Sequence, residues 1–588
     1  MKPPMTERPL CLDIESSLTG RRWLGPTPAE DRQALAISQA AEMPEIVARI
    51  LARRGVAPPE AAAFLAPALR DLMPDPSSLR DMDRAASRLH RAVDGGERIA
   101  IFADYDVDGG ASAALLLNWL RAAGREATLY IPDRLAEGYG PNVPAMERLG
   151  ASHDLIVCVD CGTLSFEPIA AAACDVIVLD HHLAGEHLPD CAAVVNPNRQ
   201  DDDAGLGHLC AAGVVFLLLV ALNRVRRAAA LPCPDLLALL DLVALATVAD
   251  VAPLMGLNRA FVRQGLAVMG RLDRPGIAAL AEIAKLKSAP NPYTLGFVFG
   301  PRVNAGGRIG APDIGARLLA TDDPNEAAAL AQKLERLNTE RRAVEARIAN
   351  QVLDQVEARG AEGPLVWAAG EGWHPGVVGI VASRLKEAFG RPAIVVAFDG
   401  DAGKGSGRSA GGLDLGAAIA RLLAEGLIEK GGGHRAAVGL SLNRAQMEPA
   451  MARLAELVAE AGTEPERHDS LEIDGVIGAA AASPELCDRI AATGPFGMGA
   501  PAPRIAIAEA RIERFRPVGE NHLALTLSDR LGGRLEAIAF RAFDSELGPA
   551  LGGLGSRPVH LAGRLERDDW GGRPKAKLHV EDAALVRE

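Results

Sequence analysis

Cysteine is scarce in this sequence, with 8 residues in a chain of 588. So low a density excludes a disulfide-dense secreted scaffold and is typical of a reducing compartment. Cys158 and Cys161 form a C-x-x-C, but no second pair stands at zinc-finger spacing. Because Cys158 lies inside the apolar run LIVCVDCG, we interpret the pair as buried structural residues, with a metal or redox role as the alternative.

Long apolar runs are also missing. The stretches 210–223 and 236–251 are too short or too interrupted to span a bilayer, which takes about 20 apolar residues. The N-terminal segment MKPPMTERPLCLDIESSLTG carries charges and prolines without an apolar centre, unlike a secretory signal. We therefore expect a cytoplasmic protein with no membrane contact.

The sequence has no excess of positive charge and few aromatic residues. The formal net charge is −13 and aromatic residues make up 4% of the chain, which argues mildly against a nucleic-acid partner. Such a partner is not excluded, because arginines lining one groove can bind phosphates on an acidic protein. Apolar residues at 48% and charged residues at 24% are ordinary for globular domains, and the length indicates about three or four of them.

The apolar pattern changes along the chain and predicts an α/β fold of several domains. Short amphipathic helical patterns fill an N-terminal helical region, 1–95. Apolar runs that alternate with alanine-rich helical stretches open the region 96–323 and are typical of a parallel sheet with helices on both faces. A second, smaller α/β domain is expected over 361–465. Short alternating strands over 466–588 predict a β-barrel, with the five-stranded oligonucleotide-binding (OB) fold as the candidate.

A continuous amphipathic pattern with many charges covers residues 324–360. It predicts one long helix of roughly 50 Å. Such a helix is either a rigid connector between the two α/β domains or an ordinary surface helix.

Acidic residues and histidines stand where several predicted strands end. They are Asp104, Asp106 and Asp108 after the run RIAIFA, Asp160 in VCVDCG, and Asp180, His181 and His182 in IVLDHH. Because the carboxyl ends of parallel strands share one edge of a sheet, where ligands bind, we expect these side chains to converge. Asp250 ends an apolar helical stretch and is expected to reach the same place.

Carboxylates held this close together repel one another unless divalent cations neutralise them. Oxygen ligands with one or two imidazoles suit Mn²⁺ or Mg²⁺ better than a metal that prefers thiolates. Two such ions about 3.5–4 Å apart are a common device for in-line attack on a phosphodiester. The sequence therefore predicts a phosphodiesterase that uses two Mn²⁺ or Mg²⁺ ions.

Simpler interpretations exist for single members of this set. One aspartate at a strand end is more often a helix cap or a turn residue. The loop Asp104 to Gly109 also begins like a calcium-binding EF-hand, which needs a glutamate about six residues after its glycine, but that position holds Leu115. Acidic or histidine positions at successive strand ends favour the metal site.

Motifs along the chain resemble a known family. DYDVDG, VDCG, DHH and VADV match, in order, the four motifs of the DHH phosphoesterase superfamily. GPRVNAGGRIGAP, GWHPGVVGIVASRL, GSGRSAGGLDL and GGGHRAAVG are similar to its RecJ branch, over roughly residues 45–585. Ala103, Gly306 and Ala500 depart from the family pattern, and none of them is a ligand position.

The resemblance implies an activity: degradation of single-stranded DNA from 5′ to 3′ with release of mononucleotides, in DNA repair and recombination. It implies DHH and DHHA1 domains followed by an OB-fold barrel. Single-strand-binding protein and a helicase are the implied protein partners, and we expect a monomer. The barrel would capture the strand through Arg511, Arg514, Arg516 and Arg534 and, more weakly, by stacking on Phe496, Phe515, Phe540, Phe543 and Trp570.

The resemblance also implies roles for the acidic and histidine residues. Asp106 and Asp160 would hold one metal ion. The other would be held by Asp108, Asp160, His181 and Asp250. Asp104 would be an extra ligand or would contact the ligands without binding the metal itself. His182 would contact the scissile phosphate or orient the attacking water.

A further implied set binds the DNA backbone and its 5′ phosphate. Its members are Arg134, Arg302, Asn304, Arg308, His374, Ser406, Arg408, Gly431, Gly432, Gly433 and His434. Arginine suits this role because its planar fork binds phosphate oxygens in pairs, and glycines allow close approach to backbone N–H groups. A surface ion pair is the alternative for each arginine, and a plain turn is the alternative for the glycines.

Two other functions compete with this interpretation. A DHH enzyme acting on oligoribonucleotides, cyclic dinucleotides or pyrophosphate would share the core, but the additional N-terminal helices and C-terminal barrel favour a polymer. A non-catalytic binding protein with a decayed core predicts lost ligands, whereas Asp106, Asp108, Asp160, His181 and Asp250 are all present.

Overall fold

The fold is seen in a computed structural model that describes residues 8–134, 136–360, 362–462, 470–555, 557–569 and 572–586. These residues form two compact units. The first unit contains 8–73, 253–263 and 470–586, and the second contains 74–252 and 264–462. The N-terminal region predicted over 1–95 thus contributes to both units. The boundary predicted at 465/466 and the candidate Trp570 lie outside the described residues.

A five-stranded parallel sheet forms the centre of the second unit, in the order β3-β2-β4-β5-β6. Its strands are β2 (Ile99–Ala103), β3 (Ala127–Tyr130), β4 (Leu155–Val159), β5 (Asp175–Leu179) and β6 (Ala193–Val195). β2 and β4 are buried at every position. Burial on both faces explains why these strands are continuous apolar runs in the sequence. The parallel sheet predicted for this region is confirmed.

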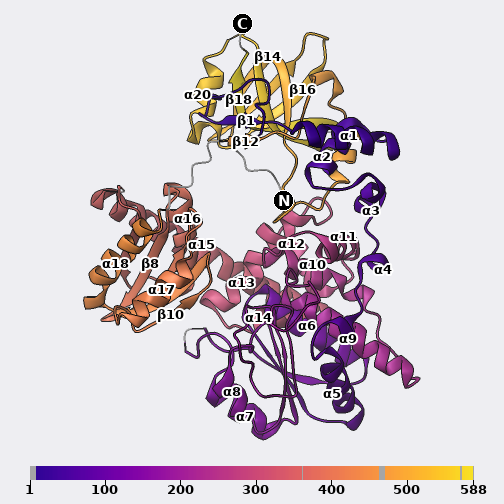
Figure 1. The fold of residues 1–588 in the computed structure, drawn as a ribbon, viewed down its shortest axis with the longest axis vertical. Coiled ribbons are helices and arrows are strands. Elements are labelled where there is room, and N and C mark those ends of the chain that lie inside the picture. Colours follow the sequence, from indigo (N-terminus) through magenta and orange to yellow (C-terminus); the bar gives the residue numbers. More distant parts are fainter. Residues whose placement is uncertain are drawn as a thin grey trace. The chain divides into compact units, whose positions relative to one another are not determined.

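Helices cover both faces of this sheet (Figure 1). α7 (Val143–Ser152) and α8 (Phe166–Ala170) share an apolar core with β2, β4 and β5 on one face. The other described α-helices of this part are α5 (Met82–Gly95), α6 (Val107–Ala122), α9 (Ala211–Ala228), α10 (Leu240–Ala249), α12 (Pro275–Ile283), α13 (Gly300–Ile309) and α14 (Ile314–Ala320), together with the C-terminal part of α11 (Gly256–Met269), whose first residues belong to the first unit. α6 packs on α9, α10 and α14, so that it is buried on nearly every side. No helix among the described residues is both long and apolar enough to cross a membrane.

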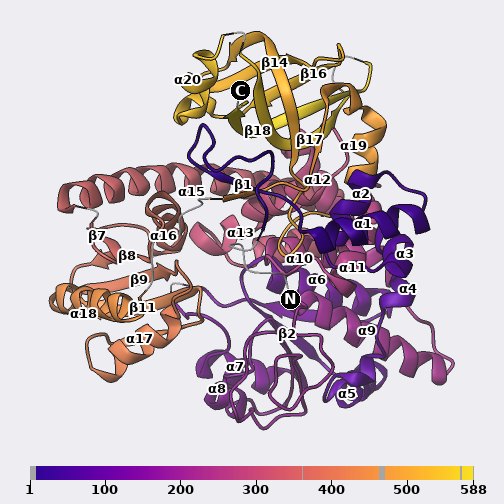
Figure 2. The same cartoon turned by 45° about the horizontal axis from the view of Figure 1, so that its top comes forward.

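One helix, α15 (Pro324–Arg359), links this sheet to a second one. It begins at the predicted residue, where Asp323 caps it by accepting a hydrogen bond from the Asn325 N–H at 2.8 Å. The N-terminal half packs on α12, α13 and α14. In its C-terminal half, Ile348, Val352 and Val356 are buried against the second sheet and α16 (Pro375–Phe389) (Figure 2). The helix is therefore a connector that is packed on both domains.

The second sheet has the order β10-β11-β9-β8-β7 and is mixed, since only β7 and β8 run parallel. Its strands are β7 (Val366–Glu371), β8 (Ala393–Asp399), β9 (Ala402–Arg408), β10 (Lys430–Gly433) and β11 (Ala437–Asn443). α17 (Leu415–Ala424) and α18 (Met447–Glu460) pack on one face. α15 and α16 pack on the other face over β7 and β8.

The first unit is built around a closed barrel, in which β14 pairs with both β15 and β17. Its strands are β13 (Gly475–Ile477), β14 (Ile505–Val518), β15 (His522–Ser528), β16 (Arg534–Ala539), β17 (Val559–Asp568) and β18 (Lys575–Leu585), with α19 (Pro484–Ala491) and α20 (Leu547–Gly552) beside them. Short N-terminal helices, α1 (Pro28–Ala40), α2 (Glu45–Arg53), α3 (Ala61–Leu65) and α4 (Leu69–Leu72), belong to the same unit. The predicted five-stranded barrel is confirmed.

A short N-terminal strand also belongs to this unit. β1 (Arg22–Leu24) pairs in parallel with β12 (Ser470–Glu472). Within β1 stands Trp23, which is fully buried and donates its indole N–H to Asp582 at 2.9 Å. The two residues are 559 positions apart, so the chain closes on itself here.

Candidate metal centre and phosphate-binding cavity

The first acidic residues lie in the tight connection from β2 to α6. Asp106 caps α6, and its Oδ1 accepts hydrogen bonds from the N–H groups of Asp108 at 2.8 Å and Gly109 at 3.1 Å. Gly109 packs directly on the preceding backbone, since a Cβ there would lie 2.5 Å from the carbonyl oxygen of Asp104. The glycine therefore lets three carboxylates follow one strand end in five residues.

Asp108 lies in the first turn of α6 and is buried. Its two carboxylate oxygens accept hydrogen bonds from the N–H groups of Ala211 at 2.7 Å and Ala212 at 2.8 Å. These N–H groups belong to the first turn of α9, where the helix dipole favours a negative charge. α9 thus fixes the orientation of Asp108, an interaction that sequence reasoning did not identify.

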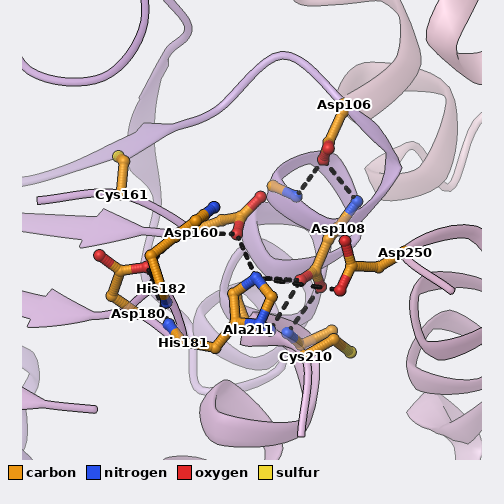
Figure 3. A network of polar contacts seen from close by, with 12 residues as sticks. Asp106, Asp108, Asp160, Cys161, Asp180, His181, His182, Cys210, Ala211 and Asp250 are labelled. Carbon is orange, nitrogen blue, oxygen red and sulfur yellow. Dashed lines mark hydrogen bonds and ion pairs between the residues drawn. The ribbon is translucent and has the colours of Figure 1, made fainter. Parts of the chain in front are cut away.

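Asp160 follows β4 and stands at the centre of the cluster (Figure 3). Its backbone has a φ of 61°, in the left-handed region that aspartate tolerates better than most residues. Its Oδ1 lies 3.4 Å from Nε2 of His181. The same nitrogen lies 3.8 Å from Asp108 Oδ2 and 3.9 Å from Asp250 Oδ2. One imidazole thus faces carboxylates from three separate elements.

The possible ligands form three overlapping groups, each with one ligand atom per residue within 4.8 Å of the others. The groups are Asp104–Asp106–Asp160, Asp108–His181–Asp250 and Asp160–His181–His182. Asp160 and His181 are each shared by two groups. We predicted from the sequence that these residues converge, and the structure brings the side chains together. The family resemblance implied that Asp160 lies between two ions.

The electrostatics of the cluster fit divalent cations. Burial, followed by repulsion from neighbouring carboxylates, raises the pKa of Asp104 and of Asp160 well above the usual range. The same two causes raise the pKa of Asp250 to about 8. Buried oxygens of Asp104 and Asp160 have no hydrogen-bond partner within the described part of the chain. Carboxylate oxygens with imidazole nitrogens are a donor set that suits Mn²⁺ or Mg²⁺, and such a charge would offset the repulsion.

His182 is held by neighbours on two sides. Its Nδ1 lies 2.8 Å from Asp180 Oδ1, and its Nε2 lies 3.2 Å from the hydroxyl of Tyr139. That hydroxyl also donates to the carbonyl oxygen of Asp160 at 3.1 Å. Burial opposes the charged imidazole, but the hydrogen bond and the charge of Asp180 outweigh it and raise the pKa of His182 to about 9. Asp180 is therefore a positioning residue.

A cavity of about 590 Å³ begins beside this cluster and extends over β9, β10 and β11. Tyr105 and Tyr139 line it on the side of the parallel sheet. Four of the residues expected to bind the DNA backbone also line it: Arg134, Ser406, Gly431 and Gly432. The guanidinium of Arg134 lies 5.2 Å from the centre of the Tyr105 ring.

Other expected substrate residues surround this cavity without lining it. Burial, then the charge of Arg134, lowers the pKa of Arg308 to about 10, and Arg308 donates to the Gly376 carbonyl at 3.1 Å. Arg408 donates to the hydroxyl of Ser383 at 3.1 Å, and its pKa is also lowered by burial and then by Arg134.

Two expected histidines also lie outside the lining of the cavity. His374 caps α16 by accepting a hydrogen bond from the Gly376 N–H. For His434, burial, Arg408 and His182 lower the pKa, in that order.

Three further expected residues also lie outside the lining of the cavity. Arg302 donates to Glu335 of α15 at 2.6 Å and to the Val298 carbonyl at 2.8 Å. Its guanidinium is therefore already engaged by protein groups. Gly433 has a φ of 140°, and a Cβ there would lie 2.4 Å from the Ala437 carbonyl, so the strand turn requires glycine. Asn304 is partly buried, and its Oδ1 has no partner among the residues described.

Sequence reasoning did not single out several residues of the cavity wall. They are Tyr105, Tyr139, Lys404, Lys430 and Ser441, all of which line the cavity. Tyr139 stands in the segment EGYG, and the glycines around a lone tyrosine could have indicated it. The two lysines lie on separate strands of the second sheet, and no linear pattern brings them together.

Three family models match the chain. A model described as the DHH family, N-terminal domain, matches residues 98–247, the DHHA1 domain matches 362–460, and the RecJ OB domain matches 473–582. These ranges cover the parallel sheet, the second sheet and the barrel, respectively.

Relatives match along nearly the whole chain. A protein of Salmonella typhimurium described as single-stranded-DNA-specific exonuclease RecJ is 37% identical over 564 residues, which are 92% of this chain and 96% of the relative. A crystal structure of RecJ from Thermus thermophilus with Mn²⁺ has a TM-score of 0.79 at 30% identity, covering 96% of this chain and 79% of that one. A structure of RecJ from the same organism with Mg²⁺ has a TM-score of 0.74 at 29% identity, with the same coverage.

Proposed function

The chain belongs to the RecJ family of the DHH superfamily, and from this premise we propose that it is a metal-dependent exonuclease specific for single-stranded DNA. One observation carries the proposal. The overlapping ligand groups that share Asp160 and His181 lie beside a cavity whose charged lining residues are basic. Divalent cations and an anionic polymer end would thus be bound side by side.

The residues of the cluster suit two ions. Asp104, Asp106 and Asp160 would hold one, and Asp108, His181 and Asp250 would hold the other, with Asp160 between them. Bound there, two divalent cations, Mn²⁺ or Mg²⁺, would supply a water of lowered pKa and neutralise charge on the phosphoryl group. The N–H groups of α9 keep Asp108 pointed into the cluster.

We assign His182 to the scissile phosphate. Its Nδ1 hydrogen bond to Asp180 leaves Nε2 facing the hydroxyl of Tyr139. Against the effect of burial, the hydrogen bond and charge of Asp180 raise the pKa of His182, which favours a ring that can donate from Nε2. It would donate Nε2–H to a non-bridging oxygen of that phosphate, and Tyr139 would limit how far the ring can turn.

The second sheet would set the polarity of digestion. Ser406, Gly431 and Gly432 line the cavity beside Arg134, and Arg408 follows Ser406 on the same strand face. These groups would hold the terminal 5′ phosphate, through paired guanidinium contacts and backbone N–H groups. Water would then attack the next phosphorus and break its bond to O3′ of the terminal nucleotide. A 5′ mononucleotide leaves, and the shortened strand keeps a 5′ phosphate.

The wider assignments belong to the same proposal. The barrel would capture the strand ahead of the site, and the enzyme would act as a monomer in cytoplasmic DNA repair and recombination. Single-strand-binding protein and a helicase would deliver the strand. Support for these assignments comes from the family and from the presence of an OB barrel and a nuclease core in one chain, a combination suited to a single-stranded polymer.

Digestion of end-labelled strands tests the proposal. Single strands and duplexes labelled at the 5′ or the 3′ end are incubated with Mn²⁺, Mg²⁺ or EDTA, using the wild type and Asp160→Ala. We expect early release of a 5′ label as a mononucleotide, gradual shortening of 3′-labelled strands, little digestion of duplex, and none with EDTA or the variant. Equal digestion from the 3′ end, or activity that survives Asp160→Ala, would contradict it.

A dinucleotide substrate separates this function from that of a small-substrate DHH enzyme. If the dinucleotide is hydrolysed with a higher kcat/KM than a long strand, the polymer substrate is wrong. Tight strand binding without cleavage in either metal would instead support the non-catalytic alternative.

A further inference from the structure

The second sheet presents three successive rows of residues on the face that carries Ser406. Arg408 pairs with Ala437, Ser406 pairs with Gly439 and, beyond it, Gly432, and Lys404 pairs with Ser441 and, beyond it, Lys430. Directly paired residues point to the same side of a sheet, and rows two residues apart are separated by roughly 7 Å. Lys404 and Lys430 therefore stand one row beyond Ser406.

The rows run away from the metal cluster. At one end of the rows, burial and then the charge of Arg134 lower the pKa of Arg408. Burial, then Arg408 and then His182 lower the pKa of His434, so the influence of His182 reaches this end. Lys404 and Lys430 lie at the other end, two rows from Arg408. A terminal nucleotide held between the metals and Ser406 would thus point its 5′ end toward the lysines.

The row that contains Ser406 is open beside this serine. Gly432 and Gly439 are exposed, and a Cβ added at either would meet no atom within 4 Å. Leu440, the next residue on β11, turns to the other face and is buried under α17 and α18. The cavity therefore continues past the Ser406 row over bare backbone, up to the row of lysines that also lines it.

The chemistry of the lining selects a phosphate over a further nucleoside. The charged residues among those that line the cavity are Arg134, Lys404 and Lys430, which are all basic. Its aromatic residues, Tyr105 and Tyr139, stand at the metal end. No ring in this lining is placed to stack a base beyond Ser406, whereas ammonium groups are well suited to phosphates.

We propose that Lys404, Ser441 and Lys430 form a second phosphate subsite, which takes the β- and γ-phosphates of a strand that begins with a 5′-triphosphate. The inference rests on the proposed function, since it assumes that the α-phosphate occupies the Ser406 row. The lysine side chains are long and flexible enough to reach from their own row toward that of Ser406. The enzyme would then accept strands with a 5′-polyphosphate as well as those with a monophosphate.

The first cleavage on such a strand has a diagnostic product. Water adds to the phosphorus between the first and second nucleotides, the P–O3′ bond breaks, and O3′ of the first nucleotide takes a proton. The released molecule is a nucleoside 5′-triphosphate, and the remaining strand carries an ordinary 5′ monophosphate. Later cycles are identical to those on a monophosphorylated strand.

A matched pair of 3′-labelled single strands, with 5′-monophosphate or 5′-triphosphate ends, tests the subsite in Mn²⁺. For the wild type we expect first-turnover kcat/KM values within about threefold of each other, and a nucleoside triphosphate as the first product. The double variant Lys404→Met, Lys430→Met should lose about tenfold or more on the triphosphate strand alone, as expected for lost charged contacts. Ser441→Asp, which adds a negative charge between the lysines, should act in the same direction.

Lys333→Met is the matched control, because Lys333 is an exposed lysine on α15 far along the chain from this sheet. It should leave both strands unchanged. Rejection of the triphosphate strand by the wild type, an equal loss on both strands in the double variant, or release of a dinucleotide first would overturn the subsite.

Direct binding separates this inference from the proposed function. Inorganic tripolyphosphate and inorganic phosphate are titrated into Asp160→Ala protein in EDTA, by calorimetry. We expect the double lysine variant, in this background, to bind tripolyphosphate about tenfold more weakly than its parent. Equal binding would count against the subsite. Failure of wild-type protein to digest the monophosphate strand would refute the nuclease proposal, while this titration still decides the subsite.

Discussion

Single side chains in the metal cluster were predictable where they directly follow a strand. Asp106, Asp160 and His181 stand at the carboxyl ends of strands that the apolar pattern marks, so their convergence follows from the parallel sheet. Tyr139 and the two cavity lysines were not predictable. Their positions depend on which face of a strand or loop meets another domain. That face depends on the register of strand pairing, which the sequence alone does not give.

The pairing of Asp180 with His182 leads to a prediction about one pKa. The hydrogen bond and charge of Asp180 hold the pKa of His182 at about 9, against the effect of burial. In Asp180→Asn this charge is gone, and we expect the pKa of His182 to fall toward its ordinary value of about 6.5, because burial is then opposed by the charges of Asp104 and Asp250 without that of Asp180. An NMR titration of the His182 ring in metal-free protein measures this.

Asp235→Asn, a change of the same kind at an exposed aspartate that accepts a hydrogen bond from the Leu237 N–H, should leave the titration unchanged. If the His182 pKa in Asp180→Asn stays near that of the wild type, Asp180 does not control the ring.

The raised pKa of Asp250 predicts how metal-free stability depends on pH. The folded carboxyl has a pKa of about 8, whereas an unfolded aspartate has about 3.9, so the folded state binds the extra proton. Its contribution to stability is therefore complete below pH of about 4 and is lost as pH rises through about 8. We expect the unfolding temperature in EDTA to decrease more steeply over this window in the wild type than in Asp250→Asn.

Added Mn²⁺ should reverse this trend, because metal binding needs the deprotonated carboxylates and so strengthens as pH rises. Differential scanning calorimetry at several pH values, with EDTA or Mn²⁺, gives both curves. Parallel curves for wild type and Asp250→Asn in EDTA would show that Asp250 does not carry the linkage.

Among the elements, those with a long and regular pattern were predicted well. α15 begins at Pro324 as expected, because its charges and apolar residues repeat along its whole length. β15, β16, β17 and β18 match the alternating segments of the sequence. β14 was not recognised, since its second half is exposed at most positions and loses the alternation. The pairing of β1 with β12 was also missed, because no local pattern predicts a partner so distant in the sequence.

The connection from β2 to α6 predicts a contrast between two adjacent glycines. A Cβ at Gly109 would lie 2.5 Å from the backbone oxygen of Asp104, so Gly109→Ala must displace the loop that holds three carboxylates. A Cβ at Gly110 would meet Ala316 at 3.5 Å, an ordinary contact. We expect Gly109→Ala to lower kcat by about a hundredfold or more, as a misplacement near 1 Å can.

Gly110→Ala should stay within about threefold of the wild type, because the added methyl needs no such displacement. Nuclease assays and Mn²⁺ titrations of both variants measure this. Similar activities in the two proteins would show that the loop tolerates a side chain at Gly109.

Within the whole molecule, the barrel is expected to supply affinity for long strands. Arg514 and Arg516 are exposed on β14, where they pair with Thr526 and Ala524 of β15. The neighbours of these two partners on β15, Leu523, Leu525 and Leu527, point into the barrel core, so both arginines face outward. Replacing both with serine should weaken binding to a long single strand. It should also reduce the slope of log K against log salt by about 1.4, since each lost phosphate contact accounts for about 0.7.

Arg567 is the matched control, because this exposed barrel arginine is already paired with Asp488 and Asp569. Arg567→Ser should change the slope little. Binding is measured by fluorescence anisotropy at several salt concentrations in EDTA. An unchanged slope in the double variant would place the strand on another surface.

The stability of the first unit should depend on Trp23. This side chain is fully buried beside β12, and its indole N–H binds Asp582, which is itself buried. We expect Trp23→Ala to lower the free energy of unfolding of this unit by about 3–5 kcal/mol. Leu35→Ala on α1, where 54% of the residue is exposed, should cost far less. Urea denaturation followed by circular dichroism compares the two, and equal losses would contradict the role of Trp23.

The contact between Trp23 and Asp582 also fixes an order of events during synthesis. The 559 positions that separate them must be translated first, which at about 5–20 residues per second takes roughly half a minute to two minutes. During most of that time the ribosome-bound chain carries a large apolar ring that still lacks its neighbours from β12, β14, β17 and β18. The N-terminal segment is therefore a natural client for chaperones that bind nascent chains, and the barrel can close only after β18 has been made.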